Sequence, residues 1–428
     1  MNDRATEVSH AGNVTNPFML QQVIGLAESL PVAVTEDIYC STGVKLVSKG
    51  SRVDASLRDR LLQHKLRKPL ERCLDVADSS LPALSAVASD AARAIPAVQA
   101  MIGPGALSEL DRVTALLQEQ GARLQLVLLG RGCRQPLGMV ALGAALAIEL
   151  AQRLQLDEML VETTAMAALL CDIGELYIDP ALLAPGRALR PEEWRHVLVH
   201  PLVSARVVRE MGIHSSLLVR AIEEHHERGT GAGYPRGLQS DAISLPARIL
   251  SVSHLLLERA AGQHWPLSRI AVGLRFMRGE HESALVDLVI SESRLTTESG
   301  GAPAREQLLP QMHALLLRIG EIVEQLHHSE EMPLDGHSRS VLGLVSQRFQ
   351  QIQRAFSSTG LDLVENEQLL WGDVAPGVLE SELAAILDEI GWRLDDLGHF
   401  LAIRAFDMPA DQQAFLQPLI DLLTDRKG

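Results

Sequence analysis

At 428 residues the chain exceeds a single ordinary core, so two or three domains are expected. A hydrophobic content of 46% with only 3% aromatic residues predicts globular domains whose cores are mostly aliphatic. The 39 Lys and Arg residues face 54 Asp and Glu residues, and the formal net charge of -15 argues against sequence-independent binding of nucleic acid, although it leaves room for a local basic pocket for a nucleotide.

The cysteines and the apolar runs bear on the cellular location. The four cysteines are scattered, without the paired spacing of a disulfide framework or a zinc ribbon, and this fits a reducing cytoplasm. The polar amino terminus lacks the apolar segment of a signal peptide. The longest apolar run, Leu137 to Ile148, is too short to cross a bilayer. We therefore expect a cytoplasmic protein without a membrane span.

The amino-terminal part is predicted to mix helix and strand. Residues 1–34 are assigned to a polar tail and a short helix, Phe18 to Leu30. Residues 35–124 are assigned to an accessory module, either a sensor or a plain α/β domain. Its predicted elements are a β-hairpin of Asp37–Cys40 with Val44–Val47, a helix capped by Asp54 and ending at Leu66, and helices Ala83–Ile102 and Leu107–Leu117.

Residues 125–300 are predicted to form a helical domain. Its helices are expected at Met139–Leu154, Glu158–Cys171, Glu192–Met211, Ser216–His226 and Pro246–Arg259. Pro201 lies inside one of these patterns and cannot donate a backbone hydrogen bond, so that helix should bend just beyond His200. A glycine-rich loop is expected from Gly229 to Gly233.

The turn-rich stretch Thr296 to Ala304 is predicted to separate this domain from a carboxy-terminal helical domain, residues 301–428. Helices are expected at Arg305–His327, Ser338–Phe356, Glu380–Ile403 and Asp411–Leu423. Trp371 and Trp392 are expected to anchor helix packing. His327, His328 and His337 are assigned to a surface loop. The fold class predicted for the whole chain is mainly α.

Side chains that bind metal ions recur at four points of the central domain. They are Cys171 with Asp172, then His200, then His225 with His226, and finally His254. The intervals are about 28, 25 and 28 residues. Each interval is long enough for one helix and its return, so successive helices of a bundle can direct one cluster of ligands at a shared centre.

Helical periodicity places these side chains on inward faces. Cys171 shares a stripe with Leu160, Thr164 and Ala167, His225 with Leu218 and Ile222, and His254 with Leu250 and Leu257. One inward histidine is more often a core residue than a ligand. Several in this order favour a metal site or the remnant of one.

The ordered motifs resemble the HD-GYP family of bacterial metal-dependent phosphodiesterases, which act on cyclic di-GMP. The resemblance rests on Ala167–Gly174, Leu183–Gly186, Pro191–Trp194, His200-Pro201, His225–Arg228, Gly233–Leu238 and Ala247–Leu250. It implies an HD-type helical bundle with a two-metal core. The hairpin and helix of the accessory module resemble, over a short stretch, modules that precede some of these domains.

The resemblance implies a set of ligands for one divalent ion of Fe, Mn or Zn. These are Asp172, His200, His225 and His226. The second family site would fall on Cys171 and His254, which replace a His and an Asp. Because neutral imidazole removes one negative charge and thiolate is softer, a second ion should bind weakly. A third site found in some members has no ligands, since no Asp, Glu or His lies between Glu119 and Glu149.

Hydrolysis of a phosphodiester requires a metal-bound hydroxide and cations near the phosphate. Glu175 stands where the family has lysine, which replaces a cation by an anion. The family's Arg-rich segment is not recognisable after His254, so Arg259 or Arg269 would have to substitute for it. We therefore assign no catalytic residue, apart from Asp172 if the protein is active.

These departures predict a bacterial signalling protein with a degenerate HD-GYP domain, which has lost or nearly lost hydrolysis of cyclic di-GMP and acts by binding a nucleotide or a protein. The alternative is an active phosphodiesterase with Cys171 and His254 as unusual ligands. The family loop, Gly233, Tyr234 and Pro235, is either a contact for a signalling protein partner or a rigid turn required by the fold. The sequence leaves a homodimer open.

Overall fold

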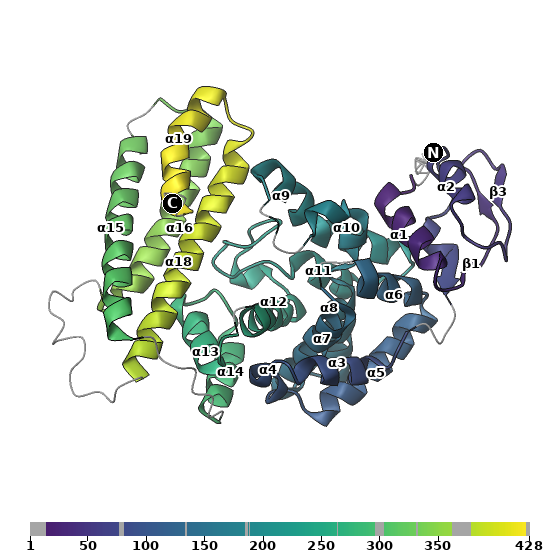
Figure 1. Cartoon of the computed structure of the whole chain (residues 1–428), viewed down its shortest axis with the longest axis horizontal. Helices are drawn as coiled ribbons and strands as arrows, with labels where there is room; N and C mark the ends of the chain where they lie inside the picture. Colours follow the sequence, from purple (N-terminus) through teal and green to yellow (C-terminus); the bar gives the residue numbers. More distant parts are fainter. Residues whose placement is uncertain are drawn as a thin grey trace, which may run out of the picture.

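The computed structural model describes residues 14–76, 81–132, 135–184, 187, 189–262, 264–295, 304–330, 333–361 and 378–424. Over these residues the chain is mainly α-helical, with two antiparallel sheets of two strands each, which confirms the predicted fold class. The strands lie in a small module at the amino-terminal end, followed by a central group of helices and then by a bundle of long helices (Figure 1). None of the described helices combines the length and the apolar character needed to cross a membrane.

The amino-terminal module begins with helix α1 (Pro17–Ala27), which is capped by the side chain of Asn16. The predicted hairpin is confirmed, because β2 (Ile38–Tyr39) pairs antiparallel with β3 (Lys45–Val47). A second sheet pairs β1 (Val32–Val34) with β4 (Leu74–Val76). The sequence does not predict this sheet, since two strands of three residues that lie far apart leave no local pattern.

Two of the predicted helices in this part are too long. Helix α2 (Ser56–Leu62) ends before Leu66, because Leu66 pairs with Cys40 of the hairpin instead. The single helix predicted from Ala83 to Ile102 is wrong. It is divided into α3 (Leu84–Ala92) and α4 (Pro96–Gln99), since Pro96 has no N–H to donate and holds the preceding residue in an extended conformation.

The central helices are arranged around α7 (Leu137–Arg153), an Ala-rich helix that is buried along most of its length. Helices α3, α5 (Pro104–Glu119), α8 (Glu158–Leu170) and α12 (Leu245–Leu257) pack against it. The other helices of this region are α6 (Arg123–Gly132), α9 (Pro191–Leu198), α10 (His200–Glu210), α11 (Ser216–Glu224), α13 (Leu267–Phe276) and α14 (Ser283–Leu295). One apolar core extends from Met19 of the amino-terminal module to Val289 of α14.

The single bent helix predicted from Glu192 to Met211 is wrong, because the chain forms two helices, α9 and α10. Pro201 lies in the first turn of α10, where a missing N–H costs nothing. The break therefore falls at Val199, just before His200 rather than just beyond it. As a result His200 stands at the amino terminus of a helix.

The carboxy-terminal bundle consists of α15 (Arg305–Glu330), α16 (Gly336–Ser357), α18 (Val378–Ala405) and α19 (Ala410–Leu423), which confirms the helices predicted there. It has its own apolar core, from Leu308 to Leu423. His327, His328 and His337 were expected in a loop, but His327 and His328 lie exposed in the last turn of α15, and His337 is the second residue of α16. Trp371 and the predicted boundary up to residue 303 lie outside the described residues.

The turn after α8 packs closely on α10 through Gly174. A Cβ atom at Gly174 would lie 2.4 Å from the carbonyl oxygen of His200 and 2.8 Å from the backbone nitrogen of Ser204. These are backbone atoms of a helix and cannot turn aside. Gly174 thus allows the residues that precede it, Cys171 and Asp172, to approach the start of α10.

Replacement of Gly174 with alanine should destabilise the central region by about 1–3 kcal/mol, because the added methyl group forces α10 away. The free energy of unfolding, from urea titration followed by circular dichroism, measures this effect. Gly25→Ala in α1 is the control, since its Cβ would meet nothing within 4 Å, and it should not destabilise. A Gly174→Ala variant as stable as the parent would contradict the close packing.

Candidate metal centre

Four segments bring the predicted ligands together. Asp172 follows α8 and precedes the 3-10 helix η3 (Ile173–Tyr177), and His200 is the first residue of α10. His225 and His226 follow the last turn of α11, and His254 lies in the last turn of α12. The potential ligand atoms form two groups, in each of which they lie within 4.8 Å of one another. The groups are Asp172 with His200, His225 and His226, and Asp172 with Cys171 and His254.

The backbone determines the tautomers of two of these histidines. Nδ1 of His200 lies 2.9 Å from the carbonyl oxygen of Val197, and Nδ1 of His225 lies 2.7 Å from that of Ile222. A carbonyl oxygen only accepts, so each Nδ1 carries the hydrogen. In the neutral rings both Nε2 atoms therefore direct a lone pair toward the centre, as in histidines that bind metals.

Three acceptors consequently face one another in the core. Nε2 of His200 lies 3.3 Å from Nε2 of His225, and a carboxylate oxygen of Asp172 lies 3.4 Å from the first and 3.6 Å from the second. Their lone pairs repel unless positive charge lies between them. A proton on one ring relieves one contact at a time, whereas a metal ion would satisfy all three.

The pKa values have the directions that this arrangement requires. Burial opposes the charged form of Asp172, yet its contacts with His200 and His225 outweigh burial and hold its pKa well below the ordinary value. Burial likewise opposes the charged form of His200, but the carboxylate of Asp172 outweighs it and raises the pKa of His200. The centre therefore attracts positive charge even without a metal.

His226 lies beside this pair, with its ring centroid 4.1 Å from that of His225 and 5.1 Å from that of His200. Burial, followed by the charges of neighbouring histidines, lowers the pKa of His226 well below its ordinary value. A neutral imidazole is the form that binds metals. His226 is thus available as a fourth ligand of the first group.

Of the loop residues Gly233, Tyr234 and Pro235, the first two lie against the histidine pair. The ring of Tyr234 stacks on that of His226, with centroids 4.6 Å apart and an angle of 22° between the planes. A Cβ atom at Gly233 would lie 2.3 Å from the backbone nitrogen of Arg228, so no larger residue fits there. The packing accounts for a glycine and an aromatic residue at these positions without any partner protein.

Cys171 and His254 face each other in the second group, with 3.8 Å between Sγ and Nε2. The thiol also donates to the carbonyl of Ala168 at 3.5 Å. Burial and then the charge of Asp172 raise the pKa of Cys171 well above its ordinary value, and burial lowers the pKa of His254 to about 4. Cys171 must therefore lose a proton at unfavourable cost before it can bind a metal.

Ser204 fixes the turn that carries Cys171 and Asp172. Its hydroxyl accepts a hydrogen bond from the N–H of Gly174 at 2.8 Å and donates one to the carbonyl of Cys171 at 2.5 Å. The side chain is fully buried. Sequence reasoning missed Ser204, because a serine in α10 carries no local sign that its partners belong to another segment.

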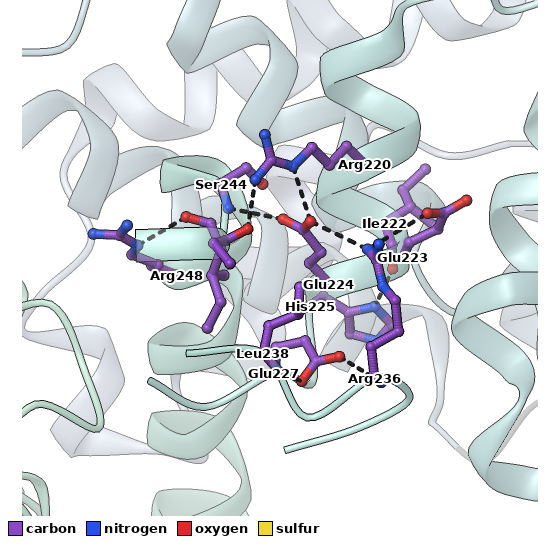
Figure 2. A network of polar contacts seen from close by, with 12 residues as sticks. Arg220, Ile222, Glu223, Glu224, His225, Glu227, Arg236, Leu238, Ser244 and Arg248 are labelled. Atoms are coloured by element: carbon purple, nitrogen blue, oxygen red, sulfur yellow. Dashed lines mark hydrogen bonds and ion pairs between the residues drawn. The ribbon is translucent and has the colours of Figure 1, made fainter. Parts of the chain in front are cut away.

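Two buried glutamates fix the chain that follows the histidine pair (Figure 2). Glu227 accepts hydrogen bonds from the backbone N–H groups of Arg236 and Leu238 at 2.7 and 2.8 Å. Glu224 accepts one from the N–H of Ser244 at 2.7 Å and so connects α11 to the start of α12. Glu227 belongs to the motif recognised in the sequence, but only the structure gives it this role.

The charge beside the centre is negative where the family has a lysine. Glu175 is buried, with 6% of its surface exposed, and its charge contributes to the raised pKa values of Cys171 and His200. No lysine occurs between Lys68 and Lys427, so none of the central helices offers a replacement.

Arg259 and Arg269, the two arginines that could substitute, interact with the carboxy-terminal bundle. Arg259 lies 4.6 Å from the ring centroid of Trp392 and 3.5 Å from the carboxylate of Glu389, both in α18. Arg269 pairs with Asp388 of the same helix. Both guanidinium groups also lie over the ring of Trp265, so each bridges the central region and the bundle.

Comparison with known proteins relates this region to a family. A family model described as HD domain matches residues 120–270. Residues of the chain are 42% identical over 109 positions to the cyclic di-GMP phosphodiesterase PA4108 of Pseudomonas aeruginosa, covering 25% of this chain and 26% of that protein. They are 35% identical over 139 positions to the cyclic di-GMP phosphodiesterase response regulator RpfG of Xanthomonas campestris, covering 30% and 35%.

Other matches have related names. A 3'3'-cGAMP-specific phosphodiesterase of Vibrio cholerae is 37% identical over 89 residues, covering 21% of this chain and 19% of that protein. The solved structure of Bd1817, an HDG"Y"P protein from Bdellovibrio bacteriovorus, covers 60% of this chain and 94% of its own, with 15% identity and a TM-score of 0.32. The chain thus matches only about a fifth to a third of the length of these curated relatives.

Metal-free protein should bind one equivalent of Zn²⁺ or Mn²⁺, and His225→Gln should abolish this binding, because the variant loses a lone pair of the first group. Isothermal titration calorimetry measures the stoichiometry. Metal at about a hundredfold excess over Kd should also stabilise the parent by about 2.7 kcal/mol. His313→Gln, an exposed histidine of α15, is the control and should bind like the parent. Two tight equivalents per chain would contradict the weak second group.

Metal affinity should fall as the pH is lowered from 8 to 6. Asp172 raises the pKa of His200, so a proton competes with the metal at this ring from above the ordinary histidine range downward. Each proton displaced on binding lowers the affinity by up to about tenfold per pH unit. Calorimetric titrations at several pH values, each in two buffers, measure the affinity and the number of protons released. An affinity independent of pH would show that no protonated histidine is displaced.

Proposed function

The chain belongs to the HD-GYP family through its HD domain, and on this premise we propose that it binds a cyclic dinucleotide at a centre with one divalent metal ion and does not hydrolyse it at a useful rate. The named relatives act on cyclic di-GMP or 3'3'-cGAMP, which makes a cyclic dinucleotide the ligand to test first. The protein would then serve in bacterial signalling as a receptor rather than as an enzyme.

The convergence of three acceptors carries the metal part of this proposal. Backbone carbonyls orient the rings of His200 and His225 so that both Nε2 atoms point toward the carboxylate of Asp172. The residues fit a divalent ion of Zn, Fe or Mn, which bind imidazole and carboxylate. Such an ion would polarise a phosphate oxygen and lower the pKa of a bound water.

The charges near the centre support binding without hydrolysis. Transition-state stabilisation in phosphodiester cleavage requires positive charge around the phosphate. Glu175 replaces a cation by an anion, and a unit charge at about 4 Å from a phosphate is worth about 4 kcal/mol at an effective dielectric of about 20. The protonated thiol of Cys171 and the neutral ring of His254 further weaken a second ion. The expected loss is several kcal/mol, or about three or more decades in rate.

One observation favours the rival function, an active phosphodiesterase with two metals. Cys171 and His254 lie near Asp172, with ligand atoms within 4.8 Å of one another, so a second ion sharing Asp172 has candidate ligands. Such an ion would require the Cys171 thiolate, which burial disfavours. We therefore place this function second. A signalling protein partner and a homodimer both remain predictions.

The purified protein with added Mn²⁺ or Fe²⁺ should bind cyclic di-GMP in calorimetry but release no linear product in chromatography. The restored variant Cys171→His, Glu175→Lys, His254→Asp should gain hydrolysis, because it recovers both the second set of ligands and the cation. The matched control restores Cys171→His and His254→Asp while keeping Glu175, and should gain metal without a comparable rate. Turnover by the parent at about 1 s⁻¹ or faster would refute the receptor function in favour of the enzyme.

A further inference from the structure

The loop after the histidine pair, residues 228–238, covers one side of the centre through the stacking of Tyr234 on His226. The central helices hold the base of this loop. The N–H of Gly229 donates to the carbonyl of Glu280 at 2.8 Å, and the N–H of Tyr234 donates to the carbonyl of His226 at 3.2 Å. The position of Tyr234 therefore depends on how firmly the rest of the loop is held.

The middle of the loop is held by the carboxy-terminal bundle. Arg348 of α16, with 8% of its surface exposed, donates to the carbonyl of Gly231 at 2.6 Å. Its guanidinium lies 4.1 Å from the ring centroid of Phe400 in α18, which restricts its orientation. A side chain 117 residues away in sequence thus satisfies a backbone carbonyl of the loop.

A second contact passes through Arg228. One Nη atom of Arg228 donates both to the carbonyl of Ala232, at 2.9 Å, and to the carboxylate of Asp396 in α18, at 2.5 Å. Asp396, together with Glu280 at 3.4 Å from the other Nη atom, orients the guanidinium that supports the loop from within. The bundle supplies the hydrogen-bond donor to the carbonyl of Gly231. It also orients Arg228, which donates to the carbonyl of the neighbouring Ala232.

Buried contacts fix the position of α18 against the central region. Arg393 of α18 pairs with Glu280 at 2.5 Å and with Glu389 at 2.7 Å, and these side chains are almost fully buried. Trp392 lies under the guanidinium of Arg259. Removing one partner of a buried pair is costly, so α18 cannot slide freely along this surface. Helix α18 also contacts α9 and α13, its neighbours in Figure 1.

We infer that the carboxy-terminal bundle sets the position of the loop over the histidine centre, with Asp396 acting through Arg228 and Arg348 acting on the carbonyl of Gly231 as positioning residues. The inference goes beyond the proposed function, because it concerns the loop of the metal-free protein. A partner or ligand that moves α16 or α18 would withdraw both contacts together and loosen Tyr234 over His226. A movement of the bundle would thereby change the cover over the centre without any direct contact with the candidate ligands.

The structure offers a contact that distinguishes this role from simple attachment of the bundle. Asp407, in the turn that follows α18, pairs with Arg195 of α9 at 3.0 Å, so it also joins the bundle to the central helices. Among the described residues neither of these two side chains forms a hydrogen bond or ion pair with residues 228–238, and both are about half exposed. Loss of Asp407 removes a carboxylate that also joins the bundle to the central helices, but it removes no contact with the loop.

Hydrogen–deuterium exchange of the metal-free, full-length protein tests the inference. Asp396→Asn and Arg348→Gln should each accelerate exchange in peptides covering residues 229–238 by about tenfold, because a local opening becomes easier by the loss of one charge-assisted contact. Peptides covering α10 and α11 should exchange as in the parent. The controls Asp407→Asn and Arg354→Gln, an exposed arginine of α16, should leave the loop unchanged.

One further variant and a measurement on the bundle keep the test decisive. Asp396→Glu retains a carboxylate and should restore most of the loop protection lost in Asp396→Asn. Asp396 is 38% exposed, so its replacement should leave the bundle folded, which exchange in α15 and α19 reports directly. Unchanged loop exchange in both Asp396→Asn and Arg348→Gln, or equal acceleration in the Asp407→Asn control, would overturn the inference. Neither outcome depends on whether the protein binds metal or nucleotide.

Discussion

The centre depends on three acceptors that are forced together in the core. The carbonyls of Val197 and Ile222 take the Nδ1 hydrogens of His200 and His225, so the other nitrogens of both rings meet at 3.3 Å beside Asp172. Such a contact is unfavourable unless a cation or a proton lies within it. The carboxylate reaches this position because η3 lies close to α10. Gly174 leaves room for this approach, and the hydroxyl of Ser204 stabilises it by a hydrogen bond.

The long helices and the clustering of the candidate ligands could be predicted from the sequence, because both follow from the helical spacing of apolar residues. The inward stripes placed Cys171 and His225 correctly among buried residues. The failures have a common cause. The apolar periodicity of residues 83–102 continues across Pro96, but the helix does not. Strands β1 and β4 lie far apart in sequence and pair only in the folded chain. Likewise Ser204, Glu227 and Arg348 owe their roles to partners in other segments, which no local pattern records.

The proposed loss of hydrolysis rests on charge more than on ligand geometry. Six candidate ligands are assembled, yet Glu175 adds negative charge beside them and no lysine is encoded between Lys68 and Lys427. The two arginines that could replace the family's cations, Arg259 and Arg269, pair with carboxylates of α18. These arginines and Arg348 thus hold the carboxy-terminal bundle and the loop, an arrangement consistent with the receptor function proposed above.

The most direct test of the central claim is anomalous diffraction from crystals of the full-length protein prepared with Zn²⁺. The account predicts one strong anomalous peak between His200, His225, His226 and Asp172, at about 2.0–2.2 Å from the ligand atoms. The peak should lie on the Nε2 side of the His200 and His225 rings, with both Nδ1 atoms still bonded to backbone carbonyls. An absence of density there, or a second peak of equal height between Cys171 and His254, would contradict it.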